Sequence, residues 1–519
     1  MPSILSREHI IAPPGFNRWL VPPAALAIHL CIGMAYGFSV FWLPLSRALG
    51  VTQPVVCADL TLARALVTTT CDWRVADLGW MYTLFFVFLG SSAALWGGWL
   101  ERAGPRKAGV VSAICWCGGI VIAAIGVVIH QLWLMWLGGG VNGGIGLGLG
   151  YISPVSTLVK WFPDRRGMAT GMAIMGFGGG AMIGAPLANL LMTHFRTPSS
   201  VGVWETFVVL AAIYFVFMMS GAFAYRVPPD SALRATSGKP VGLSHSVHYR
   251  DAPKTRQFWL IWAVLCLNVS AGIGVIGMAS PMLQEIFGAS AAVAAGFTGL
   301  ISLFNIGGRF FWASLSDRIG RKATYATFFL LGIVLYAAAP TLARAGSQSA
   351  FVLVVCVIVS MYGGGFATIP AYLADTFGTQ YVGAIHGRLL TAWSTAGIIG
   401  PVLVNYIREA QIAAGVPRQQ VYDFTMYILA GLLLLGLVAN ALVKPLRGSQ
   451  IPNPKSQTPN PKTQTPTPNV ATDLGIRDLG FGTWDFVRAT FAWAAVGIPI
   501  AWGAWVTFTQ ALVLFSGGA

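Results

Sequence analysis

The chain carries the same charged motif twice, each time at the end of a long apolar stretch. The first copy reads GGWLERAGPRK (97–107) and the second ASLSDRIGRK (313–322). Aligning Glu101 with Asp317 sets an offset of 317 − 101 = 216. The same offset then superimposes further residues without a gap: Trp96 on Trp312, Gly104 on Gly320, Pro154 on Pro370, Gly167 on Gly383 and Gly184 on Gly400. A register held across several apolar segments indicates a membrane protein built by internal duplication.

Apolar segments long enough to cross a bilayer make up most of the chain. Only 9% of the residues are charged, against roughly 25% in an average soluble domain. Runs of about 18 or more apolar residues predict an all-α integral membrane protein with twelve core spans, near 19–49, 76–100, 108–129, 133–158, 168–194, 203–225, 258–287, 293–315, 323–341, 350–374, 384–407 and 424–444. A further hydrophobic segment covers about 487–515. The N-terminus lacks a signal-peptide layout, so we expect the first span to be an uncleaved anchor.

Changes in composition divide the chain into five parts. Two six-helix bundles are predicted at 1–226 and 258–444, joined by a polar, basic cytoplasmic linker at 227–257. Residues 445–483 are proline-rich, repeat the heptapeptide NPKSQTP as NPKTQTP, and predict a disordered tether. Residues 484–519 predict an extra transmembrane or interfacial helix. Because this helix has no counterpart in the duplication, a regulatory or assembly role is favoured for it.

Positive charge is distributed unevenly between the loops on the two sides. With the N-terminus in the cytoplasm, the loops on that side hold most of the basic residues, as the positive-inside rule requires: Arg102, Arg106, Lys107, Lys160, Arg165, Arg166, Arg226, Arg234, Lys239, Arg250, Lys254, Arg256, Arg318, Arg321 and Lys322. The opposite loops are assigned Arg64, Arg74, Arg196, Arg344, Arg408 and Arg418. The net charge of +15 therefore indicates topology, and we expect no nucleic-acid partner.

Cysteines and glycines carry two structural predictions. Cys57 and Cys71 share the long first outward loop, where they form either a disulfide or two free thiols.

No CxxC pair or His/Cys cluster suggests a metal, no catalytic constellation suggests an enzyme, and no cofactor is expected. Glycines four residues apart predict close helix approach in the fourth and fifth spans: Gly140, Gly144 and Gly148, then Gly176, Gly180 and Gly184.

Arg309 is the residue that points most directly to a function. It lies eight residues before Asp317 (317 − 309 = 8), roughly 12 Å deep in a hydrocarbon core about 30 Å thick. A charge at that depth costs about 2.5–3.5 kcal/mol or more, so it should face a cavity or a partner. The duplicated position (309 − 216 = 93) is Ala93, so the shared scaffold does not require a cation there. Binding of an anion, with Asn305 one turn away on the same face, is favoured over an arginine bonded to helix ends or carbonyls.

Other polar and aromatic side chains complete the predicted site. His29 lies near the middle of the first span, and Tyr36 follows on the same face. A histidine there either handles protons or bonds a neighbouring helix, and both readings stay open. Tyr151, Tyr362 and Trp393 either line a cavity or pack against lipid and other helices. Every acidic residue of the spans lies near a helix end, so any proton coupling lacks the usual buried carboxylate.

The doubled motif, the twelve spans and the basic central loop resemble the major facilitator superfamily over residues 19–444. The resemblance implies two six-helix bundles with a substrate site between them and transport by alternating access. In that family the acid of the motif interacts with nearby helix ends and basic residues and stabilises the outward-open state. Here the resemblance assigns gating to Glu101, Arg102, Asp317, Arg318 and Arg321.

Two further stretches are similar to the oxalate/formate antiporter family of bacterial carboxylate transporters. They are GLGLGYISPVSTLVKWFPDRRGMATG (146–171) and NIGGRF (305–310). The arginine with which that family binds substrate carboxylate corresponds to Arg309. Oxalate-specific members carry a lysine in the eleventh helix where this chain has Trp393, which argues against a dianionic substrate. Eukaryotic monocarboxylate transporters are similar too, but have an aspartate at the position of Asn305.

The combined prediction is a secondary active transporter of small organic anions such as oxalate, formate, lactate or pyruvate. It would act as an antiporter or a proton symporter, and as a monomer in the bilayer of the bacterial inner membrane. One alternative is a multidrug or metabolite exporter of the same superfamily, suggested by GFGGGAMIGAPL (176–187). The other is a transporter-like sensor that binds substrate without moving it.

Overall fold

The computed structural model describes residues 4–13, 15–57, 61–162, 166–229, 247–378, 382–444, 483–512 and 514–515. These residues form helices and two isolated β-bridges, Ile11 with Val227 and Thr197 with Ser200. The all-α prediction is confirmed. Residues 445–482 of the predicted tether and most of the predicted linker at 227–257 lie outside the described residues. The last residue assigned to the tether, Thr483, instead begins a helix.

The helices of the N-terminal half are η1 (Arg7–Ile10), η2 (Arg18–Leu20), α1 (Val21–Ile32), η3 (Gly33–Phe41), α2 (Trp42–Leu45), α3 (Leu62–Ala65), α4 (Val75–Ala103), α5 (Pro105–Val128), α6 (Leu132–Met135), η4 (Trp136–Gly143), α7 (Gly144–Trp161), α8 (Arg166–Phe195) and α9 (Val203–Ala224). Those of the C-terminal half are η5 (Ala252–Lys254), α11 (Arg256–Gly277), α12 (Ala279–Phe287), α13 (Ala291–Ile319), α14 (Arg321–Arg344), α15 (Gln348–Phe377), α16 (Val382–Leu389), α17 (Thr391–Ala413), η6 (Arg418–Gln420) and α18 (Asp423–Leu442). A separate helix, α20, covers Thr483–Leu512.

The duplication predicted from the sequence extends to the helix boundaries. Helices α4 and α13 begin at Val75 and Ala291 (291 − 75 = 216), and α5 and α14 end 216 residues apart at positions 128 and 344. A glycine in the left-handed region ends both α4 and α13, with φ of 87° at Gly104 and 86° at Gly320. Only glycine adopts this conformation without steric cost, so the motif needs it at the turn between two spans.

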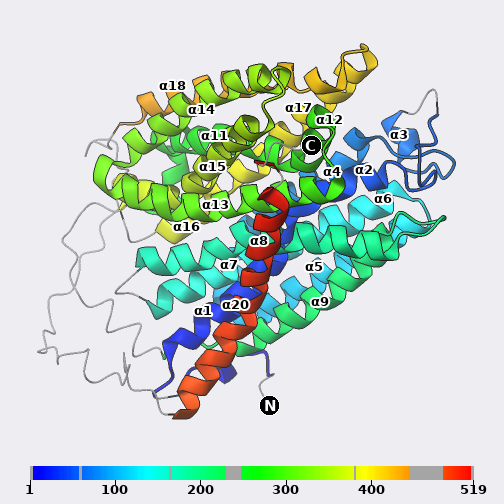
Figure 1. Ribbon diagram of the computed structural model, residues 1–519. Helices are drawn as coiled ribbons and strands as arrows, with labels where there is room; N and C mark the ends of the chain where they lie inside the picture. The colour runs from blue at the N-terminus through cyan, green and yellow to red at the C-terminus, as the bar shows by residue number, and fades with distance from the viewer. Residues whose placement is uncertain are drawn as a thin grey trace, which may run out of the picture.

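The two halves form two groups of helices that face each other (Figure 1). Within each half the duplicated helices pack alike, with α5 against α9 and α14 against α18. Between the halves, α4 packs along α17 and α8 packs along α13. These two seams enclose the space in which a site between the bundles must lie.

By length and composition, twelve helices in the described part of the chain are long and apolar enough to cross a membrane. Eleven correspond to predicted core spans and the twelfth is Val487–Gln510. The predicted fourth span, near 133–158, is instead three successive segments, in which the π-helix η4 separates α6 from α7. The first span is likewise interrupted by the 3-10 helix η3.

The regularly spaced glycines allow close helix contact, as predicted. A Cβ added at Gly140 or Gly144 would collide with side chains of α4, and one at Gly180 would collide with the backbone of Gly33. The fourth span therefore lies tightly on the second, and the fifth on the first. Small residues are what such backbone approach requires.

The ends of the bundle are distinguished by two features. At one end, called here the motif end, the turns at Gly104 and Gly320 join successive spans. At the other, called the disulfide end, Cys57 and Cys71 form a disulfide, which decides the alternative left open by the sequence. Next to this disulfide, Asp72 accepts hydrogen bonds from the backbone N–H groups of Leu49 at 2.7 Å and of Gly50 at 3.1 Å, so the loop is tied to the bundle.

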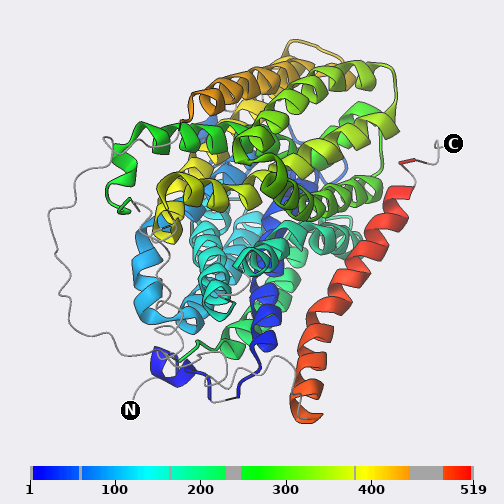
Figure 2. The same ribbon diagram turned by 90° about the vertical axis from the view of Figure 1, so that its left-hand side faces the viewer.

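Helix α20 lies at one edge of the molecule and follows the seam between the halves (Figure 2). It packs on α8 of one half and on α13 of the other. Near the motif end, Trp493 donates from Nε1 to the carbonyl of Trp19 at 3.2 Å. Towards the disulfide end, Thr507 donates from Oγ1 to the carbonyl of Met182 at 3.1 Å. The helix thus runs alongside the spans from one end of the bundle to the other.

This course of α20 predicts that the two ends of the chain lie on opposite sides of the membrane. Arg106 donates to the carbonyl of Ile4 at 3.0 Å, so the start of the chain lies at the motif end, whereas α20 finishes at the disulfide end. A tag after Ala519 should react with an impermeant label in intact cells, and a tag before Met1 only after permeabilisation. Labelling of both tags under the same condition would contradict the course of α20.

Candidate functional site

Arg309 lies buried inside α13, where no carboxylate among the described residues pairs with its guanidinium. Its side chain is 3% exposed, and Nε donates to Oδ1 of Asn305 at 3.0 Å. Nη1 and Nη2 have no hydrogen-bond partner of normal geometry within the described residues. The guanidinium lies 5.8 Å from the ring centroid of Phe366, close enough for a cation–π contact. Since buried charged donors are costly to leave unpaired, this arrangement fits the binding of an anion.

Two tyrosines from opposite halves meet beside Arg309. The hydroxyl of Tyr36 in η3 and the hydroxyl of Tyr362 in α15 share a hydrogen bond of 2.7 Å. The guanidinium of Arg309 interacts with the hydroxyls of Tyr36 and Tyr151 electrostatically and as a side-chain hydrogen-bond partner. The structure therefore brings together three of the predicted tyrosines around the predicted cation, and the Tyr36–Tyr362 bond joins the halves directly.

Trp393 of α17 is the centre of an aromatic cluster. Its ring centroid lies 4.4 Å from that of Phe366, 5.2 Å from Tyr151, 5.5 Å from Phe177 and 5.7 Å from Phe86. The cluster joins α4, α7 and α8 of one half with α15 and α17 of the other. Trp393 is thus inward-facing, and its neighbour Phe366 also contacts the guanidinium of Arg309. Sequence reasoning missed the three phenylalanines, because a phenylalanine in an apolar helix gives no signal of its own.

His29 borders this aromatic cluster from α1. Its Nε2 lies 3.1 Å from the carbonyl oxygen of Tyr151, and its ring stacks on that of Tyr151 with centroids 5.5 Å apart. The ring of Phe177 is 6.3 Å away, edge to face. This hydrogen bond to α7 fits the alternative to proton handling, in which His29 bonds a neighbouring helix.

The second copy of the charged motif links three helices of the C-terminal half at the motif end. Arg321 pairs with Asp317 at 2.5 Å and approaches Asp375 at 3.4 Å. Arg318 is exposed to solvent. The structure does not describe the side chains of Glu101 and Arg102. Contacts of the predicted gating residues are therefore given only for the C-terminal copy of the motif. Its contacts join α13, α14 and α15.

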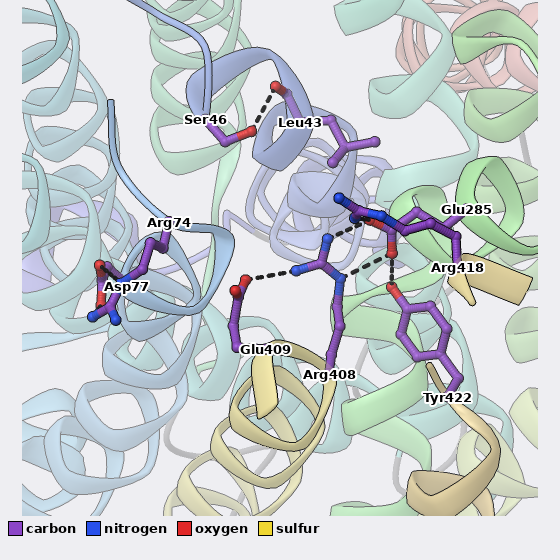
Figure 3. A network of polar contacts seen from close by, with 9 residues as sticks. All are labelled: Leu43, Ser46, Arg74, Asp77, Glu285, Arg408, Glu409, Arg418 and Tyr422. Atoms are coloured by element: carbon purple, nitrogen blue, oxygen red, sulfur yellow. Dashed lines mark hydrogen bonds and ion pairs between the residues drawn. The ribbon is translucent and has the colours of Figure 1, made fainter. Parts of the chain in front are cut away.

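A second ionic cluster, at the disulfide end, was not predicted from the sequence (Figure 3). Arg408 donates from Nε to Glu285 at 2.9 Å and from Nη1 to Glu409 at 2.6 Å. Glu285 also accepts from Arg418 at 3.0 Å and from the Tyr422 hydroxyl at 2.7 Å. The assignment of Arg408 to an outward loop was wrong. It lies within α17 and is 3% exposed, which is tolerated because the Glu285 carboxylate neutralises its charge.

Comparison with known proteins supports the same class. The model of the Major Facilitator Superfamily matches residues 25–401. An oxalate:formate antiporter of Oxalobacter formigenes is 26% identical over 392 residues, covering 74% of this chain and 83% of that protein. Monocarboxylate transporter 11 of Homo sapiens is 24% identical over 441 residues, 82% of each chain. The resemblance predicted from the motifs is therefore confirmed.

Among solved structures, a D-xylose–proton symporter superposes on the chain with a TM-score of 0.58 at 15% identity. The match covers 82% of this chain and 99% of that structure. At this identity the likeness shows the fold alone, and it confirms the two-bundle architecture.

Proposed function

Because the chain belongs to the major facilitator superfamily, we propose that it is a secondary active transporter that moves small organic carboxylates by alternating access. The observation that carries the proposal is the buried guanidinium of Arg309, which has no carboxylate partner among the described residues and contacts residues of both halves. The names of similar proteins, which include an oxalate:formate antiporter and a monocarboxylate transporter, point to the same class of substrate.

The chemistry of the cluster suits a carboxylate. A guanidinium presents two parallel N–H groups to two carboxylate oxygens, and such bidentate bonds are shorter and stronger than neutral ones. The bound anion and the buried cation each offset the other's desolvation. Because Asn305 engages Nε, it leaves Nη1 and Nη2 to the substrate.

Coupling of binding to movement follows from the residues shared between the halves. The Tyr36–Tyr362 hydrogen bond and the contacts of Trp393 join N-terminal to C-terminal helices. A carboxylate bound to Arg309 would lie close to the Tyr36 hydroxyl, because the same guanidinium interacts with that hydroxyl. It would therefore compete with Tyr362 for the hydrogen bond of Tyr36. We expect the halves to separate on one side of this cluster at a time, with Asp317 and Arg321 closing the motif end in one of the two states.

A panel of four acids tests the function. Purified protein is screened for thermal stabilisation by formate, lactate, pyruvate and oxalate, and each acid is then tested for counterflow in proteoliposomes. Counterflow with at least one acid is the expected result. Imposed pH gradients and imposed counter-substrate gradients then separate symport from antiport. Stabilisation without flux would favour the sensor, and flux of apolar drugs but of no acid would favour the exporter.

Substitution of Trp393 tests whether one cation sets the charge of the substrate. Wild type should prefer monoanions, because the second charge of a dianion would be buried without a partner. Trp393→Lys adds a cation among Tyr151, Phe177 and Phe366. The ratio of oxalate to formate uptake should then rise roughly tenfold or more. Trp393→Phe, which keeps an apolar ring, is the control. An unchanged ratio in Trp393→Lys would remove this residue from the site.

A further inference from the structure

A second polar pocket lies at the disulfide end, between the two halves. Its volume is about 90 Å³, and its polar lining comes from both halves. Arg47 follows α2 and Arg196 follows α8, whereas Ser280 and Gln284 belong to α12. The Nε2 of Gln284 donates to Oγ of Ser280 at 3.0 Å, and its second N–H remains for another partner. Asn189 and Thr193 complete the polar side of the pocket.

The charge of this pocket is uncompensated. The Nε of Arg47 is buried without a hydrogen-bond partner, and neither guanidinium, of Arg47 or of Arg196, forms an ion pair within the residues described. Burial lowers the pKa of Arg47, and the neighbouring guanidinium of Arg196 lowers it further. Arg47 is partly buried and Arg196 is exposed, and a bound anion would relieve the repulsion between the two charges that line this pocket.

Three acids close to the pocket in sequence or through their contacts are engaged elsewhere. Asp72 accepts hydrogen bonds from the backbone of Leu49 and Gly50. Glu285, directly after Gln284, is paired with Arg408. Glu205 accepts a hydrogen bond from the Ser200 hydroxyl at 2.8 Å. None of these carboxylates lines the pocket, so among the residues that the structure describes its two cations have no fixed counter-charge.

We propose that this pocket is an outer anion subsite, in which Arg47 and Arg196 hold the carboxylate of a substrate on its way to or from Arg309. The proposal rests on the proposed carboxylate transport. Paired positive charges in a partly enclosed cleft raise the local concentration of an anion and its rate of association. Because α12 supplies one wall and the end of α8 another, an anion here also touches both halves.

The size of the pocket favours a small carboxylate over a lipid headgroup, although both carry an anion that arginine recognises. A pocket of about 90 Å³ has room for several water molecules, and therefore for a small carboxylate. A phospholipid phosphate bound here would place its glycerol and acyl chains in the seam between the halves.

Transport kinetics test the subsite. Uptake of radiolabelled formate, lactate, pyruvate and oxalate, each measured separately, is compared between wild type and the double variant Arg47→Gln/Arg196→Gln. We expect KM to rise about tenfold with kcat changed less than about twofold, and the difference to shrink at high salt. Arg47→Lys/Arg196→Lys keeps the charges and should give an intermediate KM. Arg64→Gln, which removes an exposed arginine from the same end, should behave as wild type.

Binding in an Arg309→Gln background separates this proposal from the proposed function. We expect weak, saturable carboxylate binding to remain in that variant and to vanish when Arg47 and Arg196 are also replaced. A transporting wild type whose Arg47→Gln/Arg196→Gln variant keeps the wild-type KM would overturn the subsite alone. A wild type that binds and moves no acid of the panel would overturn both proposals. If phosphatidylglycerol vesicles stabilise wild type but not the Arg47→Gln/Arg196→Gln variant, and that variant keeps the wild-type KM, the two arginines bind lipid phosphate and the subsite is overturned.

Discussion

Arg309→Gln is expected to lower kcat/KM for carboxylate uptake by roughly 10²–10⁴-fold. The substitution removes two charge-assisted hydrogen bonds to substrate, each worth about 1.5–3 kcal/mol. Arg309→Lys keeps the charge but not the planar fork, so it should recover only part of the loss. Counterflow in proteoliposomes, with the amount of inserted protein measured, gives the comparison.

Stability distinguishes a binding role of Arg309 from a structural one. The side chain is buried, pairs with no carboxylate within the described residues, and has neutral neighbours in Asn305, Tyr36 and Tyr151, so the apo protein should keep or gain thermal stability when the buried charge is removed. A structural arginine would instead lower the melting temperature on replacement. Arg344→Gln, at a half-exposed arginine paired with Asp423, is the matched control and should transport normally. Wild-type uptake of every acid by Arg309→Ala would refute the proposed site.

Glu285→Ala should destabilise the C-terminal half by about 3–5 kcal/mol, because it leaves the buried Arg408 without its main counter-charge. Arg408 donates to Glu285 through Nε at 2.9 Å, and Tyr422 depends on the same carboxylate. Thermal and denaturant unfolding of the purified protein in detergent measure the effect. Uptake by the folded fraction should persist, since the cluster lies at the end of the bundle, away from Arg309.

Two variants control for this effect. Glu409→Gln removes the other, more exposed carboxylate on Arg408 and should cost much less, because Glu285 still pairs with the arginine. Glu285→Leu/Arg408→Met removes both buried charges and should recover much of the stability lost by Glu285→Ala. Equal losses of unfolding free energy in Glu285→Ala and Glu409→Gln would show that the Glu285–Arg408 pair does not contribute most of the cluster's stability.

The same pair predicts the direction of a pH effect. Burial acts to raise the pKa of Glu285, but Arg408, Tyr422 and Arg418 together hold that pKa below its usual value. A carboxyl group with a lower pKa in the folded state stabilises the fold above its unfolded pKa of about 4.3. That contribution is lost as the pH falls through the folded-state pKa. Glu285→Gln should therefore reduce the acid sensitivity of unfolding.

The architecture and the central cation were within reach of the sequence. The boundaries of the spans repeat at the offset of 216 residues because a duplicated chain keeps its register, and glycines such as Gly104 and Gly320 persist where φ must be positive. Arg309 was identifiable because the cost of a charge in hydrocarbon depends on its depth, and depth follows from counting residues along a helix. Asn305 followed from the helical repeat alone.

Only the tertiary structure decided which side chains share a space. Glu285 and Arg408 are 123 positions apart, and Arg47 and Arg196 follow different helices whose ends meet at one seam. Phe86, Phe177 and Phe366 join the site from three helices that are apolar on most faces, so periodicity does not tell which face is turned inward. In a soluble protein, water would mark the outer face with polar residues. In a bilayer both faces are apolar, and the packing of helix against helix makes that choice.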